Sequence, residues 1–146
     1  MQSLFFNHIE QQRPTAGCQL YKKYGIKGVR GEAADGFPTV LNTGIPILKK
    51  ALAEGYTKDE AGSITLLYLL SEAVDTNIIA RSDYPTYIDV KKQLNEILNK
   101  EKYPAAAIIR DLDHQFISKN LSPGGAADLL AILLVFYIFI ECDDGE

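Results

Sequence analysis

A run of twelve apolar residues near the C-terminal end, Leu129 to Ile140 (LLAILLVFYIFI), constrains the fold of this chain more than any other feature. Asp128 precedes the run and Glu141 follows it. A helix that spans a bilayer needs roughly 20 apolar residues, so a run of this length is more typical of a helix buried in a protein core. The run is apolar on every side, which predicts that other segments cover it all round, including a part of the protein outside this chain.

The rest of the chain follows the period of a helix, and no stretch alternates convincingly with the two-residue period of a strand. A chain of 146 residues, 47% apolar and 23% charged, is ordinary for one globular domain with its own core. We therefore predict an all-α fold, an irregular bundle of about five or six helices in a single domain over residues 1–146.

Caps, prolines and glycines set the expected helix boundaries. Helices are expected over residues 19–25, 44–54, 57–79, 86–99 and 104–117, with a structured loop over 27–38. Thr57 and Glu60 form a capping box. Ser122 is expected to cap the final helix, with Pro123 at its first position.

Charge and cysteine content exclude several classes of protein. The net charge is −4 and the basic residues are scattered, which argues against a nucleic-acid surface. Cys18 and Cys142 lie far apart without metal-ligand spacing, and residues 1–10 lack the pattern of a signal peptide. We expect a cytoplasmic protein without a membrane partner. The sequence contains no Ser/His/Asp nucleophile set, Walker loop or dinucleotide fingerprint.

The first polar segment that helix packing does not explain is GVRGEAADGFP, residues 28–38. Its glycines can let the backbone approach a ligand, and Arg30 can bind a phosphate through two parallel hydrogen bonds. Glu32 and Asp35 can hold Mg²⁺, which prefers one or two carboxylates and several waters. Composition alone favours the other interpretation, an interhelical loop with solvated charges.

The second segment, DTNIIAR, places Asp75, Asn77 and Arg81 at the end of an apolar helix. One ideal helix cannot direct all three polar groups to the same side, so either the helix frays or only some of them reach a site. The alternative is structural: Asp75 or Asn77 caps a neighbour, and Arg81 offsets the negative helix C-terminus.

The third segment, NLSPGGAAD, has two glycines in the expected first turn of the last helix. Glycine is a poor helix former, so Gly124 and Gly125 suit a place where free N–H groups of a helix N-terminus face a phosphate. Asp128 is one turn further on and is costly to bury unless it meets a cation, a donor or water. The alternative is that the glycines allow close helix crossing and that Asp128 stays in water.

These three segments, with their order and spacing, resemble signature stretches of the triphosphoribosyl-dephospho-CoA synthase family, over residues 15–140. The resemblance implies an enzyme in which the 2′-hydroxyl of 3′-dephospho-CoA attacks the ribose of ATP and adenine leaves, with Mg²⁺ as the expected cofactor. Asp75, Asp128 and Glu32 are then the catalytic candidates, and Glu32, Asp35 and Asp128 the metal candidates. The candidates for binding substrate or phosphate are Arg30, Gly31, Asn77, Arg81, Asn120, Ser122, Gly124 and Gly125.

Two departures accompany the resemblance. Members of the family are roughly twice as long and carry further motifs in an N-terminal half, so this chain resembles the C-terminal half alone. Family members also tend to continue the second motif with Arg-Gly-Gly, whereas Ser82 and Asp83 follow Arg81 here. The alternative function is a non-catalytic helical module that binds a nucleotide or a partner. If half of the core is missing, the apolar final helix predicts a homo-oligomer.

Overall fold

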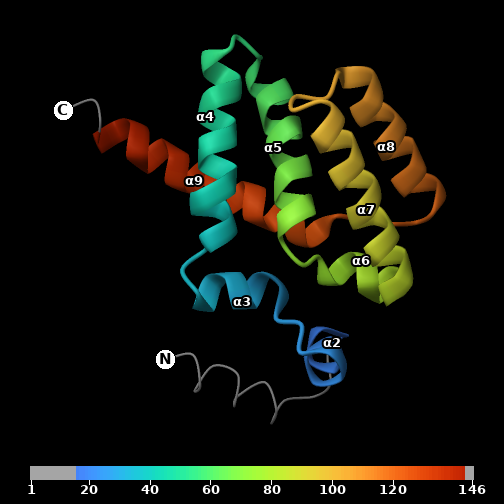
Figure 1. The fold of residues 1–146 in the computed structure, drawn as a ribbon. Coiled ribbons are helices and arrows are strands. Elements are labelled where there is room, and N and C mark those ends of the chain that lie inside the picture. Colours follow the sequence, from blue (N-terminus) through green and yellow to red (C-terminus); the bar gives the residue numbers. More distant parts are fainter. Residues whose placement is uncertain (1–15, 144–146) are drawn as a thin grey trace.

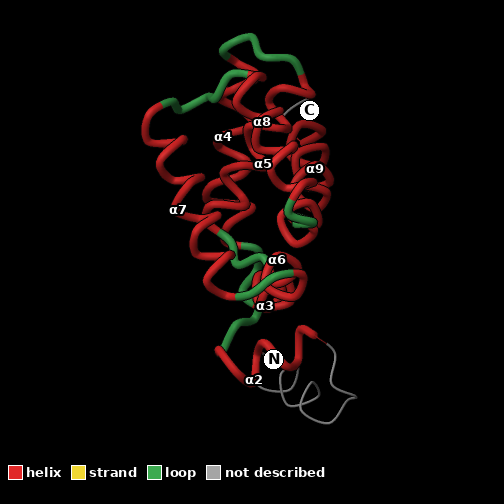
Figure 2. The backbone as a smooth tube through the Cα atoms, turned by 90° about the vertical axis from the view of Figure 1, so that its right-hand side faces the viewer, coloured by secondary structure: helices red, strands yellow, loops and turns green. Residues whose placement is uncertain are grey.

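The structure is a computed structural model that describes residues 16–143, so the interpretation of residues 1–10 lies outside it. Within that range the chain is helical and contains no strand, which confirms the all-α prediction (Figure 2). The elements are α2 (Ala16–Tyr24), α3 (Gly28–Ala34), the π-helix η1 (Val40–Gly44), α4 (Ile45–Ala53), α5 (Lys58–Glu72), α6 (Thr76–Arg81), α7 (Tyr84–Lys100), α8 (Ala106–Ser118) and α9 (Gly124–Asp143).

Helices α4, α5, α7 and α8 stand side by side, and α9 crosses behind α4 and α5 (Figure 1). The short helices α2, α3 and α6 lie together at the lower end of this layer in the same view. The core is centred on α5, where Ile64 and Leu69 are fully buried, and α9 contributes Leu129 and Leu133 to it. The bundle thus places the starts of α3, α6 and α9 at one end of the molecule.

Gly44 permits the close crossing of α9 over the chain before α4. A Cβ atom at Gly44 would lie 2.3 Å from Leu133 Cδ1 and 3.0 Å from Leu69 Cδ2. No side chain fits in that space, so the glycine lets Leu133 enter the core. Further along, Phe37 packs edge to face against Phe136, with 5.8 Å between ring centroids, and ties the segment after α3 to α9.

The helix count is higher than the five or six expected, because the structure corrects two boundaries among the described residues. Residues 28–34 were expected to be part of a loop but form α3, because Gly31 and the alanines are compatible with a helix. The helix ends just before Gly36, which has a φ of 81°. The helix expected over 57–79 divides into α5 and α6, because Ala73 is extended (ψ 162°) and Asp75 begins a new cap.

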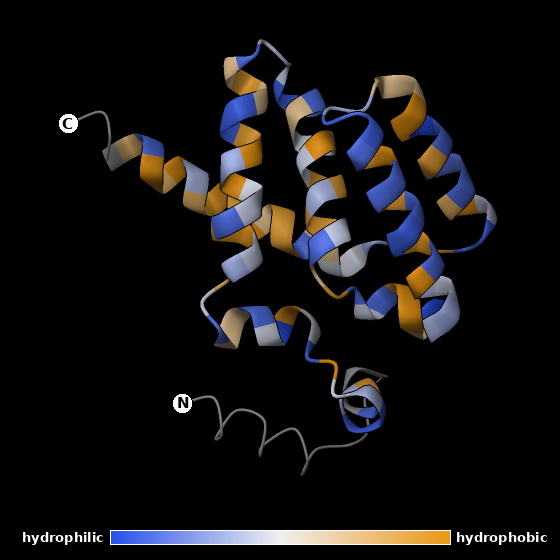
Figure 3. Ribbon diagram, viewed as in Figure 1, coloured by the Kyte–Doolittle hydropathy of each residue, from blue (hydrophilic) through white to orange (hydrophobic). Residues whose placement is uncertain are grey.

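Among the described residues, helix α9 contributes buried side chains to the core only from one face of its N-terminal half. Leu129 and Leu133 are fully buried, whereas Ile138 is 60% exposed and Phe139 is 68% exposed. Figure 3 shows hydrophobic bands continuing along the part of α9 that passes α4. By length and composition alone, Gly124–Cys142 is also the one helix of residues 16–143 that could cross a membrane. Even in the N-terminal half, Ala127 and Ala131 are exposed, so residues 16–143 cover one face of α9 and do not give the predicted cover on every side.

Candidate functional site

The three polar segments of the sequence meet where α3, α6 and α9 begin. A Cβ atom on Gly28, the first residue of α3, would lie 2.8 Å from Thr76 Cγ2 at the start of α6. Gly124, the first residue of α9, packs against Asn77, and a Cβ there would lie 2.8 Å from Asn77 Nδ2. We call this meeting of three helix N-termini the junction.

Asp75 is the centre of the junction. Its side chain is almost completely buried, with 1% exposed. Oδ1 accepts hydrogen bonds from the backbone N–H groups of Asn77 (2.9 Å) and Ile78 (3.3 Å), and Oδ2 accepts one from Ala126 (2.9 Å). One carboxylate therefore caps both α6 and α9, and the partial positive charge of two helix N-termini compensates its burial. These contacts agree with the structural alternative for Asp75, in which it caps a helix.

Gly125 allows the close approach of Asp75. A Cβ atom on Gly125 would lie 3.1 Å from Asp75 Cγ and 3.2 Å from each carboxylate oxygen. The two glycines thus make room for side chains of α6, which is the close-crossing alternative of the sequence analysis. The prediction of Ser122 as cap is corrected: α9 begins at Gly124, one residue later than expected, and Asp75 accepts from its third N–H group.

Glu32 braces the turn that follows α3. Its Oε2 accepts a hydrogen bond from the backbone N–H of Thr39 (3.1 Å), and its Oε1 accepts one from the Thr39 hydroxyl (2.5 Å). Both carboxylate oxygens are therefore engaged with Thr39, which stands immediately before η1. In this arrangement Glu32 holds α3 against the start of η1.

The remaining candidates are spread over the same three helices. Arg30, Arg81 and Asp128 are exposed on α3, α6 and α9. The junction brings together Asp75, Asn77, Gly124 and Gly125. Arg30, Arg81 and Asp128 lie on the same three helices and face solvent. Asp35 is exposed in the turn after α3, and Asn120, with φ of 52°, is exposed in the turn after α8. Gly31 is buried in α3, and Ser122 is half-buried just before α9.

The profile of the family described as ATP:dephospho-CoA triphosphoribosyl transferase (CitG) matches residues 3–144. The chain belongs to this family. The resemblance inferred from the three segments is confirmed, and those segments are the ones that the fold brings together at the junction.

Relatives in this triphosphoribosyl transferase family are identical to the chain at more than a third of the aligned positions. A probable 2-(5''-triphosphoribosyl)-3'-dephosphocoenzyme-A synthase of Pectobacterium carotovorum subsp. carotovorum (strain PC1) is 39% identical over 123 residues, 84% of this chain and 40% of the relative. The 2-(5''-triphosphoribosyl)-3'-dephosphocoenzyme-A synthase of Haemophilus ducreyi is 38% identical over 141 residues, 93% of this chain and 42% of the relative. The chain thus spans about two-fifths of their length. No solved structure matches it.

The family's reaction raises the question of a metal. Within residues 16–143, no group of three or more His, Cys, Asp or Glu side chains is placed to hold a metal ion. Mg²⁺ commonly takes one or two carboxylates together with substrate phosphates and waters. Single exposed carboxylates would therefore fit an ion that arrives with a nucleotide. Asp35 and Asp128 are exposed carboxylates, and both oxygens of Glu32 accept hydrogen bonds from Thr39.

Sequence reasoning missed Tyr87, which lies beside the junction. Burial raises the pKa of this phenol to about 12, and Tyr84 and the Asp75 carboxylate add to the rise. The rings of Tyr84 and Tyr87 are 5.9 Å apart between centroids. Their spacing of three residues at the start of α7 puts both on one helix face, which is the signal that could have found them.

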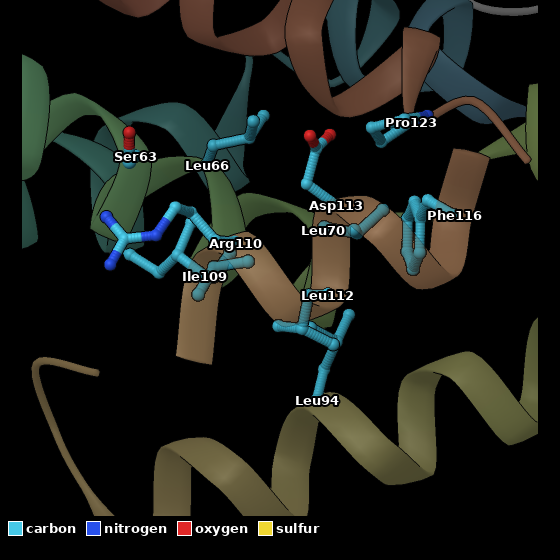
Figure 4. A pocket seen from close by; sticks show the side chains of 11 residues that line it. Ser63, Leu66, Leu70, Leu94, Ile109, Arg110, Leu112, Asp113, Phe116 and Pro123 are labelled. Carbon is cyan, nitrogen blue, oxygen red and sulfur yellow. The ribbon is translucent and has the colours of Figure 1, made fainter. Parts of the chain in front are cut away.

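A separate cavity of about 320 Å³ lies between α5, α7 and α8 and reaches Pro123, the residue before α9 (Figure 4). Its walls are leucines, Ile109 and Phe116, with Arg110 and Asp113 as its charged side chains. Pro123 is the only residue of the three polar segments that lines it within the described chain. The cavity therefore adjoins the N-terminus of α9 on a side that lacks the conspicuous polar residues of the junction.

Proposed function

We propose that this chain performs, or supplies part of, the reaction of its family: transfer of the 5-triphosphoribosyl group of ATP to the 2′-hydroxyl of 3′-dephospho-CoA, with release of adenine. One observation carries the proposal. Three segments that are far apart in the sequence meet at the junction, through Gly28 with Thr76 and Asp75 with Ala126. Because the chain spans about two-fifths of its relatives, the rest of the catalytic site is supplied by further protein or by a second copy.

In the proposed step the 2′-hydroxyl oxygen bonds to C1′ of the ATP ribose as the bond from C1′ to adenine breaks. The hydroxyl proton passes to a carboxylate, and N9 of the departing adenine takes up one proton from water; the carboxylate then returns its proton to water, so the step is balanced. The triphosphate carries the largest charge, and helix N-termini and arginines stabilise such anions. Arg30 and Arg81 are the proposed phosphate ligands, with Gly31, Asn77, Asn120, Ser122, Gly124 and Gly125 as the neighbouring backbone and polar groups.

The three candidate carboxylates, Asp75, Glu32 and Asp128, differ in their hydrogen bonds and in their exposure to solvent. Asp75 accepts three backbone hydrogen bonds and is buried, which supports a positioning role. Glu32 is engaged with Thr39. Asp128 is exposed on the first turns of α9, so it is the candidate to accept the hydroxyl proton. Mg²⁺ bound with ATP would neutralise part of the triphosphate charge, with Asp35 and Asp128 as its protein ligands.

The proposal extends to assembly and location. Leu134, Val135, Ile138 and Phe139 of α9 are between 43% and 68% exposed. An apolar face of this kind is typical of an interaction surface, which supports a homo-oligomer of this chain. A cytoplasmic location agrees with the substrates ATP and dephospho-CoA.

The experiment is chromatography of a reaction containing the chain, Mg²⁺, ATP and 3′-dephospho-CoA. We expect free adenine together with a product heavier than dephospho-CoA. Asp128→Asn and Arg81→Gln should each lower the rate at least about tenfold, as expected for a proton acceptor or a phosphate ligand. Asp111→Asn, which removes an exposed carboxylate from α8, should leave the rate unchanged.

If neither adenine nor product forms, the same mixture with the N-terminal half of a relative added separates two conclusions. Restored turnover that depends on Asp128 would keep the chain in the enzyme. Nucleotide binding without turnover, both for the chain alone and with the added protein, would refute the proposed reaction and indicate a non-catalytic module.

A further inference from the structure

A hollow of about 320 Å³ lies between α2, the C-terminal end of α6 and the start of α7. It is distinct from the cavity beside α8, with which it shares no lining residue. Ile79 and Ala80 of α6 form one wall. The aromatic and polar side chains around it are Gln19, Lys23, Tyr24, Ser82, Asp83 and Tyr84.

Two tyrosines stack at this hollow and remain open to solvent. The rings of Tyr24 and Tyr84 lie 5.0 Å apart between centroids, with 14° between their planes. Tyr24 is 41% exposed and Tyr84 is 37% exposed. The ammonium group of Lys23 lies over the Tyr24 ring, 5.0 Å from its centroid. An exposed aromatic ring with a lysine ammonium over it is a platform on which a flat heterocycle can stack.

A row of rings connects this platform to the junction. The buried Tyr87 lies 5.9 Å from Tyr84, and the Asp75 carboxylate is close enough to influence the ionisation of Tyr87. Helix α6 separates the hollow from Asp75 along the chain, and its six residues rise about 9 Å. The hollow is therefore within one nucleoside length of the junction.

We propose that this hollow is a subsite for an adenine base, stacked on the Tyr24 ring in place of the Lys23 ammonium. This inference rests on the proposed function, in which both substrates carry adenine. In ATP the base is attached to the carbon under attack, and in dephospho-CoA it is attached beside the attacking hydroxyl. Either base must lie close to the reacting atoms, as the hollow does to the junction.

The polar groups of the hollow suit the remaining parts of a nucleotide. The displaced Lys23 ammonium can reach a phosphate. The Ser82 hydroxyl donates its hydrogen to the carbonyl oxygen of Ile78 (2.7 Å), which leaves its lone pairs to accept from an adenine amino group. Gln19 offers an amide, with one acceptor and two donors, to the edge of the base.

Calorimetric titration of the whole chain with adenosine, AMP and ribose 5-phosphate tests the proposal without requiring turnover. We expect adenosine and AMP to bind. Tyr24→Leu and Tyr84→Leu should each weaken adenosine binding about tenfold, whereas Tyr24→Phe should retain it because stacking needs only the ring. Lys23→Gln should weaken AMP binding and leave adenosine binding unchanged. Tyr56→Leu, in a separate pair with Tyr103 whose centroids are 5.4 Å apart, is the matched control.

Adenosine that fails to bind, or binds equally to wild type, Tyr24→Leu and Tyr84→Leu, overturns the subsite whether or not the chain releases adenine. Tyrosine-dependent adenosine binding by a chain that never turns over supports the subsite and counts against the proposed function. In an active protein, the substrate whose KM rises in Tyr24→Leu identifies the source of the base, ATP or dephospho-CoA. Circular dichroism and the second tyrosine variant separate lost binding from lost folding.

Discussion

The Oδ2 atom of Asp75 and the backbone N–H of Ala126 are joined by a 2.9 Å hydrogen bond across 51 positions of sequence. Because the other carboxylate oxygen caps α6, one anion serves the N-termini of two helices. The geometry of each helix start therefore depends on the other, and substitution at Asp75 affects both.

Asp75→Asn should destabilise the fold by about 2 kcal/mol, the usual range for losing a buried hydrogen bond to a charged group. The asparagine amide can accept through one oxygen, but its NH2 group would face either the Ala126 N–H or those of α6. Urea unfolding measures the loss. Asp111→Asn, at an exposed position of α8, should change the free energy of unfolding little. Equal effects of the two variants would contradict the double-cap description.

Gly125→Ala should destabilise the protein although alanine is the better helix former. Its Cβ would lie 3.1 Å from Cγ of Asp75, which three hydrogen bonds hold in place. Gly62→Ala in α5 is the matched control, because a Cβ there has nothing within 4 Å. That variant should gain up to about 1 kcal/mol from helix propensity alone. Thermal unfolding of the two variants should therefore shift in opposite directions.

Tyr87 should make the folded state lose stability at alkaline pH. Its pKa is raised from 10.0 to about 12, first by burial and then by Tyr84 and Asp75. Between these values the unfolded chain releases the phenol proton and the folded chain keeps it, so stability falls as pH rises through this window and is intact below it. Urea unfolding at about pH 9 and about pH 11.5 should show a smaller loss for Tyr87→Phe than for wild type.

Replacing Ile138 and Phe139 with serine should abolish concentration-dependent association of the chain. These two residues are the most exposed large apolar side chains of α9 among those described, so the change removes apolar surface without opening the core. Light scattering across a range of concentrations measures the effect. Unfolding of the double variant should match that of a wild-type monomer, while Leu133→Ala, a fully buried position, should destabilise by about 2 to 5 kcal/mol. A wild-type chain that stays monomeric would refute the homo-oligomer.

Local signals in the sequence predicted several helix boundaries. The capping box at Thr57 forms, with the Thr57 N–H donating to Glu60 Oε2 (2.9 Å) and the Glu60 N–H donating to Thr57 Oγ1 (3.3 Å). Helix α4 ends where Gly55 adopts φ of 93°, and α2 ends before Gly25 with φ of 67°. These features depend on residues within one turn of each other, so the sequence alone contains what they need.

Contacts across the chain were not predictable in the same way. The break between α5 and α6 depends on Asp75 accepting from Ala126 as well as from its own helix, and no local pattern names that partner. The glycine pair in α9 allowed two interpretations, because a glycine fits either an approaching ligand or an approaching side chain. The sequence did identify the three segments that meet, since their polar residues had no place in a helical core.

The double cap also closes the segment that contains α7 and α8 into a large loop, whose two ends meet at Asp75. The chain leaves the junction just after Asp75 and returns to it at Ala126, and one carboxylate fixes both ends. Lengthening the Glu101–Ala105 link at the far end changes the closure entropy only slowly and moves neither end. The outer parts of α7 and α8 can therefore be remodelled, or carry an inserted domain, while the geometry at Asp75 stays as it is.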